Sequence, residues 1–157
     1  MKISIGSDHR GLHLKGKLIP LLEDLGHEVA DIGTHDGKSV DYPDYAARVA
    51  GDVSRGDADR GILICGTGIG MSIAANKFPH VRAATVHDEL EAEMCRRHND
   101  VNVLCLSGDM LGERPIDGMI RLWLNTEFEG GRHQRRLEKI QQFEQPAGQQ
   151  PSGGCGG

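Results

Sequence analysis

The sequence lacks the features that mark several large classes of protein. No run of 18 consecutive apolar residues is present to cross a membrane, and the first residues, MKISIGSDHR, contain no signal-peptide core. No CxxC pair occurs, and the four cysteines form no regular framework (Cys65, Cys95, Cys105 and Cys155). These absences predict a cytoplasmic protein with free thiols.

Positive charge and aromatic residues are also scarce. The 157 residues carry 18 Lys and Arg against 23 Asp and Glu, which gives a formal net charge of −5. No general basic field is therefore available to hold nucleic acid or an anionic membrane, and neither partner is expected. Aromatic residues make up only 4% of the chain, whereas glycine occurs 22 times, which indicates many tight turns. A chain of this length suits one domain with its own core.

Short apolar runs alternate with longer stretches of helical periodicity. The expected strands are 2–6, 28–32, 61–65, 82–86 and 102–107, and the helices between and after them are 11–25, 43–54, 69–77, 88–97 and 113–124. This repeat predicts a single three-layer α/β domain, in which helices cover both faces of a five-stranded parallel sheet. Such sheets bind ligands at the carboxyl ends of their strands.

Two segments follow the last of these units. Residues 132–144 predict a further, C-terminal helix with an apolar stripe of Leu137, Ile140 and Phe143. This helix has no strand of its own to cover, which indicates that it packs elsewhere, for example on a partner. Residues 145–157 are rich in Gly, Pro and Gln and predict a disordered tail, so the domain is expected to span 1–144.

A glycine-rich turn follows the third expected strand. In GILICGTGIGMSIAANK (61–77) the strand ends at Cys65, and Gly66, Gly68 and Gly70 allow a sharp turn that exposes backbone N–H groups at the start of a helix. Such a turn can stabilise an anion or a developing oxyanion. The dinucleotide fingerprint GxGxxG is not met, because a methionine stands at its third glycine, and no GK[ST] follows. A nicotinamide or flavin site is therefore the weaker alternative.

Titratable groups lie at two of the expected strand ends. Cys65, beside the exposed N–H groups, is either a base or nucleophile whose thiolate they favour, or a small buried strand residue. Asp8 and His9 follow the first strand, where they form either part of a site or a helix cap. Polar groups at two ends of the same sheet edge favour the site.

Later residues also have two interpretations each. His98 and Asn99 precede the last strand, as part of a site or of a polar turn. Arg132 and Arg136 share one helical face, suited to binding a phosphate or carboxylate unless that face is simply solvated. The other histidines show no HExxH or similar spacing, so no metal site is expected (His13, His27, His35, His80, His87 and His133).

Together these motifs resemble the ribose-5-phosphate isomerase type B family, which includes the galactose-6-phosphate isomerase subunits. The resemblance covers residues 1 to about 144 and rests on SDHRG (7–11), DYPDYA (41–46), GILICGTGIGMSIAANK (61–77), RHND (97–100) and EGGRHQRR (129–136). It implies a Rossmann-like fold and a cofactor-free aldose–ketose isomerase, with ribose 5-phosphate as the leading substrate. It also implies a homodimer whose sites use residues of both subunits, and leaves open whether dimers pair into tetramers.

The resemblance implies roles for individual residues. Cys65 is the base that moves a proton between C2 and C1 of the sugar through a cis-enediolate, whose charge the N–H groups of Gly66, Gly68 and Gly70 stabilise. His98, with Thr67 nearby, opens the sugar ring. The remaining roles are in binding: Asp8 and Asn99 hold hydroxyls, Tyr42 borders the sugar, and His9, Arg132 and Arg136 hold the phosphate.

Two departures refine these expectations. One branch of the family has a carboxylate base on the helix after the glycine turn, but that helix here reads MSIAANK without a glutamate, so the cysteine branch is closer. Where many relatives have a phosphate-binding arginine after the last strand, this chain has Asp109, with Arg114 as a candidate replacement. Allose 6-phosphate, galactose 6-phosphate, a four-carbon sugar phosphate and a non-phosphorylated sugar are therefore alternative substrates. A non-catalytic sugar-phosphate-binding protein is the alternative outside the enzymes.

Overall fold

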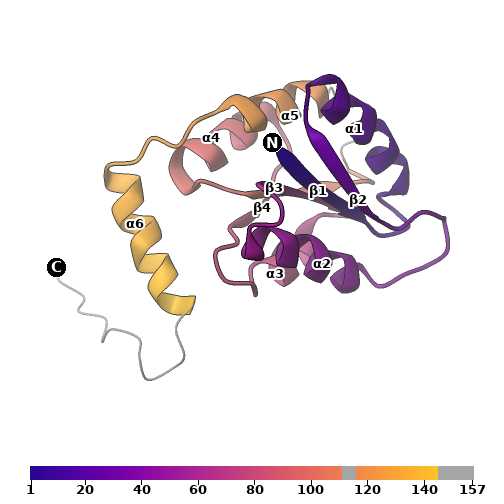
Figure 1. Ribbon diagram of the computed structural model, residues 1–157, viewed down its shortest axis with the longest axis horizontal. Coiled ribbons are helices and arrows are strands. Elements are labelled where there is room, and N and C mark those ends of the chain that lie inside the picture. The colour runs from indigo at the N-terminus through magenta and orange to yellow at the C-terminus, as the bar shows by residue number, and fades with distance from the viewer. Residues whose placement is uncertain (111–115, 145–157) are drawn as a thin grey trace.

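The computed structural model describes residues 1–110 and 116–144 (Figure 1). Its centre is a five-stranded sheet in the order β2-β1-β3-β5-β4, in which every neighbouring pair is parallel. The strands are β1 (Lys2–Ser7), β2 (Glu28–Gly33), β3 (Arg60–Cys65), β4 (Ala83–Thr85) and β5 (Val103–Ser107). The helices are α1 (Leu12–Asp24), α2 (Tyr42–Arg55), α3 (Ile69–Ala75), α4 (Glu89–Asn99), α5 (Ile116–Asn125) and α6 (Arg132–Gln141), followed by the 3₁₀ helix η1 (Gln142–Glu144). The expected three-layer α/β fold is confirmed.

The side chains of the central strands alternate between two apolar cores. Ile62 and Ile64 of β3 pack with α1, α4 and α5, in a core that also buries Trp123. Leu63 and Cys65 of the same strand face the opposite way, into the core covered by α2 and α3. The two helical layers lie on opposite faces of the sheet (Figure 1). Because successive strand residues point to opposite faces, a continuous apolar run such as ILIC is what a doubly covered strand requires.

Most expected boundaries lie within one or two residues of the observed ones, and those of α4 and β4 are among the boundaries that shift. α4 continues to Asn99 instead of ending at 97, and Asp100 ends it with a positive φ of 47°. The Asp100 carboxylate pairs there with Arg82 and Arg96, which stabilises this unusual backbone conformation. β4 is a three-residue edge strand where 82–86 was expected, and just before it the Arg82 carbonyl accepts from the N–H groups of both Asn102 and Val103.

The C-terminal helix α6 stands away from the sheet, beyond the end of α4 (Figure 1). Within the described residues, α6 makes its main contacts with α4 and η1. The expected disordered tail at 145–157, with Cys155, and the expected role of Arg114 lie outside those residues. Within them no helix combines the length and apolarity needed to span a bilayer.

Candidate active site

Asp8 and Cys65 lie next to each other at the carboxyl edge of the sheet. Asp8 follows β1, Cys65 ends β3, and the two strands are neighbours, with the Asp8 N–H donating to the Ile64 carbonyl at 3.1 Å. β2 lies on one side of β1 in the sheet, and β3 lies on the other side, so the order of the strands reverses direction at β1. Ligands of open α/β sheets bind in the crevice at such a switch point. The two strand ends identified in the sequence therefore meet where a ligand site is expected.

The Cys65 sulfur faces a backbone donor. Its side chain is 5% exposed, and its Sγ accepts a hydrogen bond of 3.1 Å from the Gly68 N–H. Burial raises the pKa of the other two described cysteines, to about 11 for Cys95 and further for Cys105. All three are free and buried. An N–H donor aimed at sulfur stabilises negative charge on it, so Cys65 is the cysteine placed for proton transfer.

A different structural feature favours glycine at each of the three glycine positions of the turn. Gly68 has a φ of +77°, which favours glycine whatever the space around it. A Cβ on Gly70 would lie 2.6 Å from Cζ of Tyr42, so the tyrosine ring covers the turn. A Cβ on Gly66 would lie 2.8 Å from the Asp109 carboxylate. The turn is thus closely overlaid by side chains and leaves no room for substitution.

Thr67 lies within the turn, and His9 lies in the loop after β1. Thr67 is exposed, and its Oγ1 accepts from the Ile69 N–H at 3.3 Å, at the start of α3. His9 is half-buried, and its Nδ1 accepts from the Val40 N–H at 3.3 Å, which fixes the ring against the segment before α2. Both residues lie at the edge of the sheet where the sequence placed them.

Asp8 is held in the turn that follows β1. It is 6% exposed, and its Oδ1 accepts from the N–H groups of Arg10 at 2.9 Å and Gly11 at 3.1 Å. These contacts form a turn before α1, whose N-cap Gly11 has no side-chain cap of its own. They fix the carboxylate at the end of β1, the strand that pairs with the strand ending at Cys65.

Arg10 and Asp109 form an ion pair over Gly66 that the sequence did not predict. Arg10 is 57% and Asp109 37% exposed, so the pair borders solvent at the mouth of the turn. The only sequence signal was an aspartate where an arginine was expected. The structure supplies a cation at this place from the loop after β1 instead.

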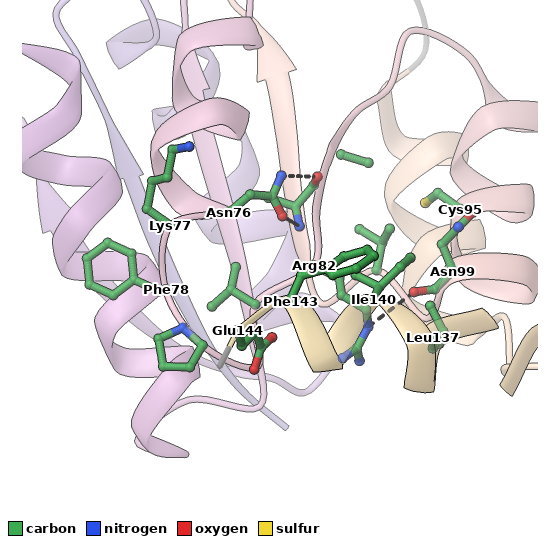
Figure 2. Close-up of a pocket in the computed structure, with 15 residues that line it drawn as sticks. Asn76, Lys77, Phe78, Arg82, Cys95, Asn99, Leu137, Ile140, Phe143 and Glu144 are labelled. Atoms are coloured by element: carbon green, nitrogen blue, oxygen red, sulfur yellow. Dashed lines mark hydrogen bonds between the residues drawn. The ribbon is translucent and has the colours of Figure 1, made fainter. Parts of the chain in front are cut away.

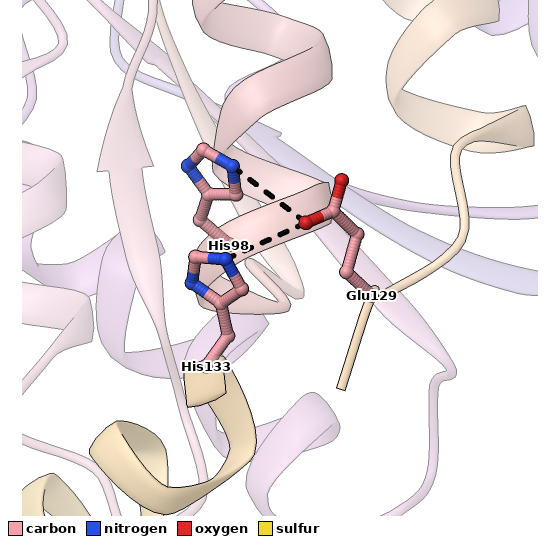
Figure 3. Close-up of side chains that lie close together, drawn as sticks. All are labelled: His98, Glu129 and His133. Atoms are coloured by element: carbon pink, nitrogen blue, oxygen red, sulfur yellow. Dashed lines mark ion pairs between the residues drawn. The ribbon is translucent and has the colours of Figure 1, made fainter. Parts of the chain in front are cut away.

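His98 forms a second cluster with Glu129 and His133 (Figure 3). The His98 and His133 rings are stacked, with centroids 4.3 Å apart and an interplanar angle of 6°. Both face the same Glu129 oxygen. Burial, and then the nearby His98 and Arg132, lower the pKa of His133. A hydrogen bond from Arg97 lowers the pKa of Glu129, so the carboxylate stays charged.

Glu129 and His133 were missed as site candidates. They stand four residues apart in EGGRH, but the third member of the cluster lies 31 residues before Glu129, so no local spacing signals the group. Arg132 and Arg136 lie on the exposed side of α6, as their spacing predicted. In the described part of the chain Arg136 has no ion-pair partner.

This second cluster lies at the amino edge of the sheet. The Asn102 carbonyl accepts from the Gly61 N–H at the start of β3, and the Arg82 side chain, just before β4, donates to the Asn99 carbonyl at 3.1 Å. His98 and Asn99 are therefore near the beginnings of the strands, because α4 runs back along the sheet.

The expected site residues thus fall into two groups within one chain. Asp8, Cys65 and the glycine turn lie at the carboxyl edge, whereas His98 and Arg136 lie at or beyond the amino edge. β3 alone separates these edges by about 17 Å, because its six residues are joined by five steps of ~3.3 Å each. One small ligand cannot contact both groups of the same chain.

An apolar groove separates α6 from the edge of the sheet (Figure 2). It has a volume of about 680 Å³, and its lining includes Phe78, Val81, Leu137, Ile140 and Phe143. Ile140 is 48% and Phe143 69% exposed. A second apolar patch borders the glycine turn, where Tyr42, Ile69 and Ile73 are 38%, 55% and 60% exposed. Contiguous exposed apolar surfaces of this kind mark interaction sites.

Known proteins are similar to this chain in sequence and in fold. A family model described as Ribose/Galactose Isomerase matches residues 3–140. The chain is 45% identical to ribose-5-phosphate isomerase B of Escherichia coli (strain K12) over 144 residues, covering 92% of this chain and 97% of that protein.

Solved structures agree. Ribose-5-phosphate isomerase B of Clostridium thermocellum superimposes with a TM-score of 0.90 at 49% identity, covering 92% of this chain and 97% of that one. Ribose-5-phosphate isomerase B of Mycoplasma genitalium, solved with bound ribulose-5-phosphate, gives a TM-score of 0.87 at 43% identity, covering 91% of this chain and 95% of the other.

Proposed function

This chain belongs to the ribose/galactose isomerase family, and from that premise we propose that it interconverts ribose 5-phosphate and ribulose 5-phosphate without a cofactor. It is a sugar-phosphate isomerase of the aldose–ketose type, as are its relatives named ribose-5-phosphate isomerase B. The observation that carries the chemical proposal is the Cys65 sulfur, held against the Gly68 N–H at the glycine turn.

Cys65 acts as the base in this proposal. Its thiolate takes the proton from C2, the C2–H electron pair forms the carbon–carbon double bond, and the carbonyl oxygen on C1 gains negative charge. The resulting cis-enediolate lies over the N–H groups of the turn at Gly66, Gly68 and Gly70, which stabilise the developing charge. The thiol then returns the proton to C1, while the hydroxyl proton moves from O2 to O1 and C2 becomes the carbonyl. Atoms and electrons balance with no external reagent.

His98 opens the sugar ring before this step, with Thr67 beside the anomeric carbon. An imidazole can carry a proton from the anomeric hydroxyl to the ring oxygen near neutral pH. Asp8 and Asn99 hold hydroxyls and Tyr42 borders the sugar, while His9, Arg132 and Arg136 bind the phosphate.

The site is shared between two copies of this chain. Because the Cys65 and His98 groups lie at opposite edges of one sheet, a second copy has to supply the His98, Asn99, Arg132 and Arg136 half. The two exposed apolar surfaces, at α6 and beside Tyr42, support a self-complementary contact in which each surface meets the other twice. A homodimer then holds two equivalent sites.

The phosphate is held without the arginine that many relatives have after the last strand. Asp109 stands at that place, and Arg10 lies against it over Gly66. A guanidinium is thus present at the same edge, which supports a phosphorylated substrate over a neutral sugar.

A coupled assay for ketose formation tests the proposal. The chain is treated with a chelator and offered ribose 5-phosphate, allose 6-phosphate, galactose 6-phosphate, a four-carbon aldose phosphate and free ribose. We expect the highest kcat/KM with ribose 5-phosphate. A higher kcat/KM with another sugar would make that sugar the substrate in place of ribose 5-phosphate. A requirement for added metal or nucleotide would overturn the proposal that the reaction needs no cofactor.

A further inference from the structure

Three metal-binding side chains converge on one point at the junction of α4 and α6 (Figure 3). The Nε2 of His98 lies 3.9 Å and the Nε2 of His133 lies 3.4 Å from the same Glu129 oxygen, Oε2. Each pair of ligand atoms in the group lies within 4.8 Å. The three residues come from the last turn of α4, the loop before α6 and the first turn of α6.

The neighbouring arginines show how the oxygen and nitrogen atoms of this group are engaged. Arg97 donates from its Nε to the other Glu129 oxygen, Oε1, at 2.6 Å, which leaves Oε2 directed at the two rings. Arg132 donates from its Nε to the His133 Nε2 at 3.3 Å, so that nitrogen presents its lone pair and not a proton. A carboxylate oxygen and an imidazole lone pair therefore face each other. Arg132 is the cation that meets the His133 lone pair in this arrangement, and a metal ion would replace it there.

We propose that His98, Glu129 and His133 bind a divalent transition-metal ion, and that Zn²⁺ fits this site best. Two imidazole nitrogens and one carboxylate oxygen are a donor set that zinc uses with its fourth position open. Mg²⁺ and Ca²⁺ prefer oxygen ligands throughout, so neither suits two imidazoles. Bonds of about 2.0–2.2 Å require ligand atoms about 3.3 Å apart, and an imidazole binds a metal ion in the plane of its ring. Because the two ring planes are nearly parallel, at 6°, one ring has to turn out of the stack when the ion binds.

The surroundings are arranged as they are around metal ligands. His133 is only 5% exposed, whereas the His98 side chain is 37% exposed, so His98 is the ring with room to turn toward the ion. Arg97 orients the Glu129 carboxylate, as outer partners orient ligands in other metal sites. Arg132 is exposed, and its guanidinium must leave the His133 lone pair when a metal binds.

A metal ion bound to Nε2 of His98 would take the lone pair with which that nitrogen can accept a proton. This consequence rests on the proposed function, in which His98 moves protons on the sugar. Zn²⁺ is then an inhibitor and not a cofactor, because its binding withdraws a catalytic group from the substrate.

Calorimetric titration of the metal-free full-length chain with ZnCl₂ tests the site. We expect one Zn²⁺ per chain, and at least a ~10-fold loss of affinity in Glu129→Gln and in His133→Asn, since even outer partners contribute 10–100-fold. Glu129→Gln keeps the shape of the side chain, and circular dichroism shows whether His133→Asn is folded. Arg132→Leu removes the competing donor and its charge, so affinity should rise. MgCl₂ serves as the control cation and should give no comparable binding.

His80→Asn is the matched control variant. His80 faces a single carboxylate, Glu144, at 3.7 Å, and its φ of +64° is one that asparagine adopts readily. Its Zn²⁺ affinity should be unchanged. Unchanged Zn²⁺ binding in both Glu129→Gln and His133→Asn, or equal binding of Mg²⁺, would overturn the metal site.

The ring-opening role is tested separately from the metal site. Isomerase activity measured in the presence of a chelator tests the proposed function without the metal. When Zn²⁺ is added instead, we expect it to inhibit the wild type more than Glu129→Gln. Tight binding that requires Glu129 and His133 without any inhibition would leave the metal site in place and overturn the role of His98.

Discussion

Cys65 and Cys105 form a natural pair for testing the proposed base. Both are buried on the side of the sheet covered by α2 and α3, but only Cys65 accepts a backbone N–H. We expect Cys65→Ala to lose ~10²–10⁴-fold in kcat while substrate still binds, as is usual when a general base is removed. Calorimetry with substrate and a coupled assay measure the two effects.

Cys105→Ala is the control for this substitution. It removes a sulfur from the same core, so it should lower the free energy of unfolding and leave kcat close to that of the wild type. Near-normal turnover in Cys65→Ala, or an equal loss of turnover in both variants, would place the base elsewhere.

Substitutions of Arg10 and Asp109, which form an ion pair, should change KM in opposite directions. Asp109→Asn removes a negative charge beside an anionic substrate and releases Arg10, so KM for the sugar phosphate should fall. Arg10→Ala should raise KM. Both effects should shrink at high salt, because the pair borders solvent. Steady-state kinetics at two ionic strengths measures them, and a KM that moves in the same direction in both variants would contradict the account.

The lowered pKa values of two histidines predict how the free energy of unfolding depends on pH. Burial, and then the N-terminal ammonium and Arg60, lower the pKa of His27 from 6.5, and burial also lowers that of His133. The unfolded chain therefore takes up these protons first, and the free energy of unfolding should fall as pH drops below about 6.5. Urea denaturation at about pH 8 and about pH 5 measures the change. His27→Gln should show a smaller decrease than the wild type, and an equal or larger one would contradict the assignment.

Which residues could be predicted depends on how local their signal is. Cys65, Gly68 and Gly70 stand together in one motif, and turn geometry alone explains why they occur in that order. Glu129 and Arg10 became candidates only in the structure, because their partners His98 and Asp109 lie 31 and 99 residues away in the chain. Side-chain pairs at such separations depend on tertiary packing, which periodicity does not describe.

At the scale of elements, apolar patterning predicted all five strands and the order of helices between them. Most boundaries moved by only one or two residues, and the shift at the end of α4 has a side-chain cause. α4 is longer than expected because Arg82 and Arg96 stabilise Asp100 in its left-handed conformation. The strand order could not be predicted, because the sequence of a buried strand carries no signal for which neighbour it pairs with.

The start of α3 provides a test of the glycine turn as an element. Gly70→Ala places a methyl group 2.6 Å from the Tyr42 ring, so the ring has to move off the site. We expect kcat/KM to fall at least ~10-fold, since small displacements of substrate-positioning groups cost up to 10²-fold. A coupled assay measures the loss.

Gly16→Ala is the matched control on another helix. A Cβ at Gly16 meets nothing within 4 Å, and alanine in a helix interior should raise the free energy of unfolding by about 0.5–1 kcal/mol. Its activity should be unchanged. A Gly70→Ala enzyme as active as Gly16→Ala would show that Tyr42 does not border the substrate.

At the scale of the whole molecule, the sheet itself separates the two halves of the proposed site. Cys65 and His98 lie at opposite edges, and the exposed apolar stripe of α6 lies beyond the second edge (Figure 1). A compact chain that leaves Ile140 and Phe143 so exposed has a surface suited to covering by another chain. Folding of one copy and assembly of the proposed site are therefore separate events, which makes subunit mixing informative.

Mixing two inactive variants distinguishes a shared site from a site within one chain. Cys65→Ala and His98→Ala, unfolded together at equal concentration and refolded, should form about half of their dimers as mixed pairs. Each mixed dimer holds one intact site and one site that lacks both groups, so about a quarter of wild-type activity should return. If Cys65 and His98 of the same chain formed one site, every site in every dimer would be broken and no activity would return. Differently sized tags on the two variants show by native mass measurement that subunits exchanged, and each variant refolded alone must stay inactive.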